Sequence, residues 1–137
     1  MFILYMDESG VEELHSPPAH FVLLGVMIPA DSWKDMVTEL EAVKEVYDLR
    51  DVEIHSAWMH RRYSEQDSIP GFAQSSRPER STQVENEFRR KAGNIGVRGT
   101  KKKIEAYRRE VRSIRPYIHL THQERRGCLE ALASKLA

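Results

Sequence analysis

Two apolar runs near the N-terminus, Phe2 to Met6 and Phe21 to Ile28, constrain the fold more than any other feature of the sequence. Neither run alternates polar with apolar residues, so each predicts a strand that is covered on both faces. Residues 11–19 contain two adjacent prolines and predict the connection, and the two strands are expected to pair antiparallel. With one further candidate strand along the chain, the predicted sheet has two or three strands, which is few for a stable sheet.

An amphipathic helix is expected after the second strand, which Pro29 ends. Ser32 offers an N-cap, and its spacing to Asp35 resembles a capping box. Apolar residues then recur at helical spacing from Trp33 to Tyr47, so the helix is expected to lay an apolar face on the strands. The short apolar stretch over residues 52–55 predicts the start of a third strand.

The second half of the chain predicts helices. A helix is expected over about residues 79–92, and the three glycines of residues 93–99 then indicate a flexible, basic loop. Thr100 can cap another helix, which Pro116 ends. The spacing Thr121-x-x-Glu124 is a capping box for a last helix with an apolar stripe.

Composition excludes several classes of protein. The chain has 137 residues, 40% hydrophobic and 31% charged, which is enough for one domain with a core. No apolar run approaches the roughly 20 residues of a membrane span, and the short apolar N-terminus is not a secretory signal, so we expect a cytoplasmic protein without a membrane partner. The single cysteine, Cys128, excludes an internal disulfide and a cysteine metal cage, and its apolar helix predicts a core position.

The net charge of zero conceals a division of charge along the chain. Residues 1–60 hold 12 Asp and Glu against 3 Lys and Arg, whereas residues 61–137 hold 9 acidic and 18 basic residues. One interpretation is two solvated faces that attract each other. The other is a carboxylate metal site beside a surface that holds phosphates.

The acidic tetrapeptide Asp7-Glu8-Ser9-Gly10 directly follows the first predicted strand. A carboxylate at a strand end is held firmly and faces a crevice, which suits a ligand of Mg²⁺ or another hard cation. Since neighbouring residues of a strand point to opposite faces, we expect Asp7 to point into the site and Glu8 to support it or orient the turn. The alternative is an acidic turn that only ends the strand.

A second acidic element, Glu53-Ile54-His55, follows the predicted helix. In an extended segment, residues two apart share a face, so the carboxylate and the imidazole are expected side by side. They can share a metal, or one can bind the metal while the other moves a proton. The alternative is a surface pair on an edge strand.

Basic residues of the second half form clusters with tyrosines nearby, a combination that suits a nucleic-acid backbone and unstacked bases. Such runs are also common on solvated helix faces. The candidate nucleic-acid contacts are Arg61, Arg62, Arg89, Arg90, Lys91, Lys101, Lys102, Lys103, Arg108 and Arg109.

The order of these motifs resembles the domain-of-unknown-function 3800 family. The likeness covers residues 2–59: a strand ending in Asp-Glu-Ser-Gly, the strand FVLLGVMIP, a helix that begins near a Trp, and Glu-Ile-His. It implies an RNase H-like fold with acidic metal ligands, in proteins that are mostly bacterial or phage-borne. Asp7 matches the first-strand carboxylate, Glu8 its neighbour, and Glu53 and His55 the later element. Family members are typically longer, with more strands, so we expect this chain to be truncated at its C-terminus or completed by a homodimer or a partner chain.

The expected fold is therefore α/β: an RNase H-like mixed sheet with a packing helix, followed by a basic helical segment of the same domain. Residues 1–59 are expected to form the strand–strand–helix–strand core, and residues 60–137 the basic segment. The expected function is phosphodiester hydrolysis by a metal-dependent nuclease, with Mg²⁺ or Mn²⁺ on Asp7 and Glu53 and a catalytic set completed by Glu8 and His55. The alternatives are a non-catalytic module that binds nucleic acid or protein, and an inactive fragment of a longer family member.

Overall fold

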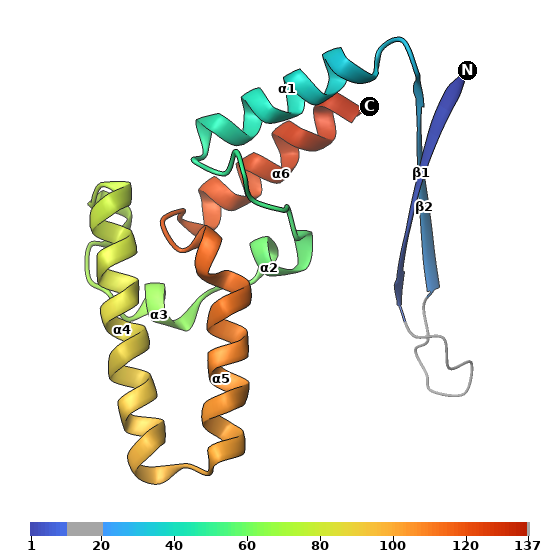
Figure 1. Cartoon of the computed structure of the whole chain (residues 1–137). Helices are drawn as coiled ribbons and strands as arrows, with labels where there is room; N and C mark the ends of the chain where they lie inside the picture. Colours follow the sequence, from blue (N-terminus) through green and yellow to red (C-terminus); the bar gives the residue numbers. More distant parts are fainter. Residues whose placement is uncertain (11–20, 137) are drawn as a thin grey trace.

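The computed structural model describes residues 1–10 and 21–136, and within them the chain is α/β, with a two-stranded antiparallel sheet and a majority of helix. The hairpin of β1 (Phe2–Gly10) and β2 (Phe21–Pro29) stands beside a helical body (Figure 1). The expected connection over residues 11–19 lies outside the described residues. No helix of the described chain is both long and apolar enough to cross a membrane.

The expected antiparallel pair of strands is confirmed, and its register runs from Phe2 opposite Pro29 to Gly10 opposite Phe21. The expected end of the first strand is wrong, because β1 continues through the acidic tetrapeptide to Gly10. Backbone pairing with β2 extends that far, so Asp7 and Glu8 lie within the strand and point to opposite faces.

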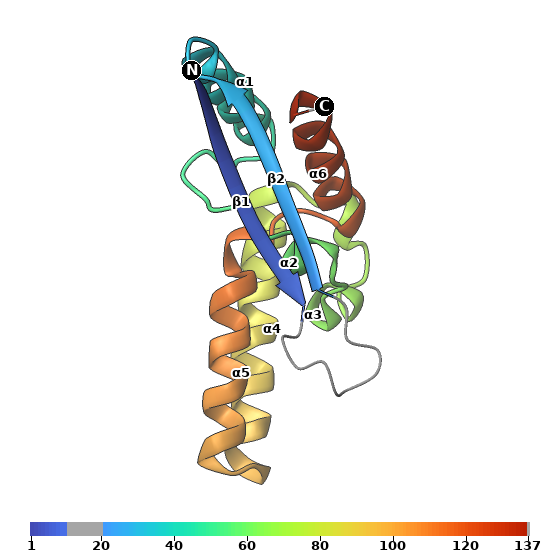
Figure 2. The ribbon, with the colours of Figure 1, turned by 90° about the vertical axis from the view of Figure 1, so that its right-hand side faces the viewer.

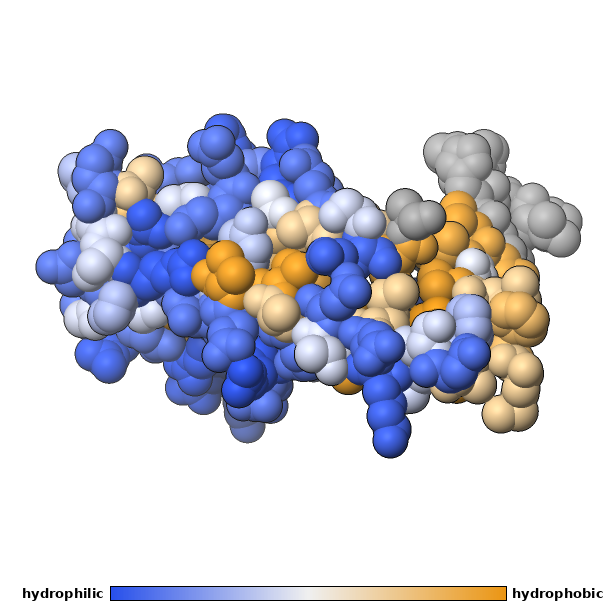
Figure 3. Space-filling view, turned by 90° about the horizontal axis from the view of Figure 1, so that it is seen from above, coloured by the Kyte–Doolittle hydropathy of each residue, from blue (hydrophilic) through white to orange (hydrophobic). Residues whose placement is uncertain are grey.

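The two faces of the hairpin differ in what they contact. The inner face turns toward the helices and carries Ile3, Tyr5 and Asp7 of β1, with Ile28 buried at the end next to α1. The outer face turns away from the helices, and Phe2, Leu4, Met6, Leu23 and Met27 on it are exposed; on the inner face, Tyr5, Val22 and Leu24 are exposed as well. The expectation of strands covered on both faces is therefore wrong for this structure, and apolar surface gathers at the hairpin end of the molecule (Figure 3).

Helix α1 (Trp33–Val46) confirms the expected amphipathic helix. The expected cap is wrong, because the Ser32 side chain makes no capping hydrogen bond. The Trp33 ring stacks on Tyr5 of the inner face, with ring centroids 5.3 Å apart. Further along, α1 lies beside the last helix, α6 (His122–Leu136), rather than along the strands (Figure 1). Consequently no residue of α1 is fully buried.

The third strand expected over residues 52–55 does not form; those residues are an extended connection between α1 and α2 (Ser56–His60). A side chain replaces a neighbouring strand here. The Tyr117 hydroxyl donates to the Glu53 carbonyl and accepts from the His55 backbone N–H at 3.2 Å. Backbone groups that would have required a sheet are thereby satisfied.

The helical body continues with three short segments and three longer helices. It comprises α3 (Ser64–Asp67), η1 (Phe72–Gln74), α4 (Arg77–Arg98), α5 (Lys101–Ile114), η2 (Arg115–Tyr117) and α6. The cap expected at Thr100 is confirmed, since its hydroxyl accepts from the Lys103 backbone N–H. The capping box of Thr121 and Glu124 is confirmed as well, since each side chain accepts from the backbone N–H of the other residue.

The glycine-rich loop expected over residues 93–99 is wrong, since α4 runs through Gly93 and Gly96 and ends at Arg98. A helical glycine costs about 1 kcal/mol relative to alanine. Helix α4 offsets this cost with a capping box at Ser76 and with Val84 and Phe88 buried against the rest of the body.

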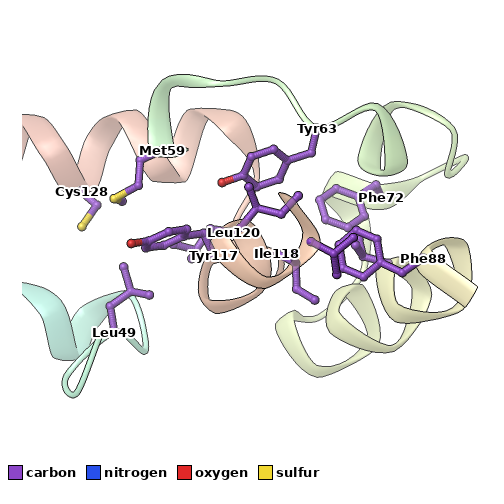
Figure 4. Packing of buried hydrophobic residues seen from close by; sticks show 12 residues of the cluster. Leu49, Met59, Tyr63, Phe72, Phe88, Tyr117, Ile118, Leu120 and Cys128 are labelled. Carbon is purple, nitrogen blue, oxygen red and sulfur yellow. The ribbon is translucent and has the colours of Figure 1, made fainter. Parts of the chain in front are cut away.

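The core lies among the helices rather than beneath the hairpin (Figure 4). Its buried members come from α2, from η1, from α4 to α6 and from the connections between them: Leu49, Met59, Tyr63, Phe72, Val84, Phe88, Val111, Ile114, Tyr117, Ile118, Leu120 and Cys128. The expected core position of Cys128 is confirmed, and burial raises the pKa of its thiol.

Candidate functional site

Asp7 lies on the inner face of the hairpin, next to Tyr5 in the alternation of β1 and opposite Leu24 of β2. Its side chain is exposed, and its Oδ1 accepts a hydrogen bond of 2.9 Å from the Glu8 backbone N–H. Figure 1 shows the hairpin edge-on, with the inner face toward α2, and Figure 2 shows its broad side in front of α2. Asp7 therefore occupies the side of the sheet on which the helices lie.

Glu53 and His55 are brought together, as their spacing predicts. The His55 Nε2 lies 3.4 Å from the Glu53 Oε1, and both side chains are more than half exposed. Their backbone is fixed by Tyr117, a core residue of η2, whose hydroxyl bonds both residues. The pair is thus a solvent-accessible carboxylate and imidazole on a backbone held from the core.

The third predicted participant is not joined to this pair. Within residues 1–10 and 21–136, no group of three His, Cys, Asp or Glu side chains lies close enough to hold a metal ion. Glu8, the fourth predicted residue, lies on the outer face, away from Glu53 and His55. The donor types suit a hard divalent cation, with two carboxylates and an imidazole, but the described coordinates do not converge on one ion.

The predicted nucleic-acid contacts divide into paired and unpaired cations. Arg61 pairs with Glu110 at 2.6 Å, Arg90 with Glu87 at 2.7 Å, and the half-buried Lys91 with Glu65 at 3.0 Å. In the part of the chain that the structure describes, the other predicted cations make no ion pair and are exposed: Arg62, Arg89, Lys101, Lys102, Lys103, Arg108 and Arg109.

Most of these exposed cations lie on α5. Its apolar side packs inward, with Val111 and Ile114 buried. At 100° per residue, Lys102 and Arg109 lie on the opposite side, and Lys101 and Arg108 lie on the flank between the two sides; the members of each pair are about two turns apart. Because a solvated row of cations can neutralise successive phosphates, this side of α5 is the strongest candidate for a nucleic-acid contact.

A hollow of about 390 Å³ opens between α2 and α5, beside this basic side. Its lining residues are Trp58, Arg61, Ala106, Arg109, Glu110 and Ser113. Trp58 is not among the site residues predicted from the sequence, because nothing local connects it with α5, some fifty residues later. The available signal was its place between the predicted Glu-Ile-His element and the Arg61-Arg62 pair.

Comparison with known proteins adds no family to this geometry: no family model, no curated protein and no solved structure matches the chain.

Proposed function

We propose that this chain carries the acidic site of a metal-dependent nuclease with an RNase H-like arrangement of its first two strands. The single observation that carries the proposal is the side on which Asp7 lies. Tyr5 stacks on Trp33 and so fixes the inner face of β1 toward the helices, and Asp7 shares that face. The connection that leads into α2 lies on the same side of the hairpin (Figure 1), and this connection contains Glu53 and His55. The order of the motifs, which resembles that of the domain-of-unknown-function 3800 family, is in line with the same proposal.

Asp7 and Glu53 would hold Mg²⁺ or Mn²⁺, which would activate water and stabilise the leaving oxygen of the phosphodiester. His55 would move a proton, since its Nε2 lies 3.4 Å from the Glu53 Oε1 and is exposed to the same solvent-accessible region. Glu8 takes no part in the site, because its side chain points to the outer face.

Nucleic-acid binding without hydrolysis is the second candidate. The observation that favours it is the exposed basic side of α5, whose cations make no ion pair within the described residues. In the same part of the chain, no three His, Cys, Asp or Glu side chains lie close enough to hold a metal ion. The two candidates differ in what Asp7 does. Hydrolysis requires it as a ligand, whereas phosphate contacts on α5 do not involve it.

Metal binding tests the proposal directly. Free Mn²⁺ is followed by its electron paramagnetic resonance signal while the protein is titrated in. Asp7→Asn and Glu53→Gln should each weaken Mn²⁺ binding at least tenfold. Glu8→Gln is the matched control, since it removes one carboxylate from the same strand on the other face and should leave binding unchanged.

Cleavage is then measured on labelled single-stranded and double-stranded DNA and RNA in Mg²⁺ and in Mn²⁺. The expected result is cleavage by the parent and by Glu8→Gln, with no cleavage by Asp7→Asn. Equal Mn²⁺ binding by the parent and the two site variants, or an absence of both binding and cleavage, would reject the nuclease in favour of the second candidate.

A further inference from the structure

The hollow between α2 and α5 brings together an indole, two guanidinium groups and a hydroxyl. We propose that it binds one unpaired base of a single-stranded nucleic acid, with the following phosphate on Arg109. This inference rests on the proposed function in one respect: the strand bound here would be the substrate of the acidic site.

The indole of Trp58 is held in place from behind. Its ring is half-buried against the core, and its backbone is fixed at both ends of the peptide unit. The Trp58 N–H donates to the His55 carbonyl at 3.1 Å, and the Trp58 carbonyl accepts from the Tyr63 hydroxyl at 2.9 Å. A rigid aromatic ring that also lines an open hollow is a platform on which a base can stack at little cost in side-chain entropy.

Arg61 and Glu110 form the wall next to Trp58. The Arg61 guanidinium lies over the Trp58 ring, 5.4 Å from its centroid, and forms a 2.6 Å ion pair with the Glu110 carboxylate. Because Glu110 neutralises Arg61, this pair supplies planar and polar contacts to a base rather than net charge for a phosphate.

The phosphate contact falls to Arg109. It lines the hollow and makes no ion pair within the described part of the chain, and it stands in the row of α5 that continues to Lys102. A strand whose base lies on Trp58 can therefore continue along cations in one direction. His55 lies three residues before Trp58, at the start of α2.

A single strand fits this hollow better than a duplex or an acidic peptide. In a duplex, both faces of an interior base are covered by its neighbours, so the base cannot stack on Trp58. An acidic peptide would satisfy Arg109 but offers no aromatic face to the indole. The combination of a half-buried ring that lines the hollow with a cation therefore selects an unpaired nucleotide.

The test measures binding of fluorescein-labelled dT12 to the whole chain by anisotropy, at low salt and in EDTA. Trp58→Ala should weaken binding about 5- to 100-fold, the range expected for loss of one stacked base, and Trp58→Phe should restore most of it. Arg109→Ala should weaken binding and lower the slope of log K against log salt by about 0.7, the value for one phosphate of a single strand. Arg89→Ala, on α4 and outside the hollow, is the matched charge control and should keep more of the affinity than Arg109→Ala.

Circular dichroism at 222 nm establishes that each variant is folded. The proposal is overturned if Trp58→Ala binds dT12 like the parent, if a blunt duplex shows the same loss with Trp58→Ala, or if poly-glutamate displaces dT12 equally well from the parent and Trp58→Ala. Because EDTA removes metal ions, these results are independent of the acidic site. Binding that depends on Trp58 without any cleavage would reject the nuclease and leave this site standing.

Discussion

Replacement of Arg125 by methionine should remove a large part of the stability of the helical body. The side chain is fully buried in α6 and its guanidinium lies 3.8 Å from the centroid of the Tyr63 ring. Its nitrogens donate to the carbonyls of Met59, Arg61 and Leu120 at 2.7–3.1 Å and to the Gln66 side chain at 2.9 Å. One residue of the last helix thus holds the backbone between α2 and α3.

The magnitude follows from the acceptors that lose their donor. The Leu120 carbonyl keeps a hydrogen bond from Gln66, so three acceptors are left without a partner: the carbonyls of Met59 and Arg61 and the side-chain oxygen of Gln66. Each unsatisfied buried acceptor costs about 1–3 kcal/mol. Burial of the Arg125 guanidinium has a desolvation cost, which also lowers the pKa of this group. The methionine variant does not have this cost, and its absence offsets part of the loss. We expect a net loss of about 3–5 kcal/mol, against a total stability of about 5–15 kcal/mol for a domain.

Urea unfolding followed at 222 nm measures this loss. With an m-value of about 2 kcal/mol per M, the midpoint of Arg125→Met should fall by about 2 M. Arg126→Met is the matched control, because Arg126 is the exposed neighbour on the same helix and has a 3.6 Å contact with Glu130; its midpoint should shift by less than about 0.3 M. An Arg125→Met protein within about 1 kcal/mol of the parent, at the same m-value, would refute the reasoning.

Two further predictions concern pH. Burial raises the pKa of Glu124, but hydrogen bonds from Thr121 and the charge of Arg80 outweigh this effect and leave the pKa below its ordinary 4.5. The ionised carboxylate therefore stabilises the fold above pH 4.5, and this stabilisation is lost as the pH falls further. Urea midpoints measured from pH 6 to pH 3 should decline more in the parent than in Glu124→Gln. Burial, partly opposed by Arg125, raises the pKa of Tyr63 from 10.0 to about 12, so the stabilisation is present below pH 10 and is lost between pH 10 and pH 12. Over that interval the midpoint of the parent should fall more steeply than that of Tyr63→Phe, and parallel curves in either series would contradict the assignment.

The elements that the sequence predicts well are those whose cause is local. The periodic apolar residues after Trp33 and the caps at Thr100 and Thr121 act within one or two turns, and each appears in the structure. The continuation of α4 through Gly93 and Gly96 was not predictable in this way, because packing of distant residues outweighs the local preference. The missing third strand has a similar cause, since Tyr117, more than sixty residues later, satisfies the backbone of residues 53 and 55.

The candidate site divides along the same line. The pairing of Glu53 with His55 follows from a spacing of two residues, and the opposite directions of Asp7 and Glu8 follow from the alternation of a strand. The position of Asp7 relative to Glu53 and His55 depends on how the hairpin packs against α1. The role of Trp58 depends on the packing of α5 beside α2. Apolarity likewise predicted that the strands would be buried, but it carries no information about what covers them.

The position of Arg125 in the sequence also determines when the helical body can complete its folding during synthesis. The acceptors of its side chain lie in residues 59–66 and at Leu120, and the Tyr117 hydroxyl reaches back to residues 53 and 55. Residues 53–66 therefore cannot complete these contacts until residues 117–125 have emerged. Such late, long-range closure leaves core segments exposed during synthesis and favours their capture by chaperones that recognise apolar segments.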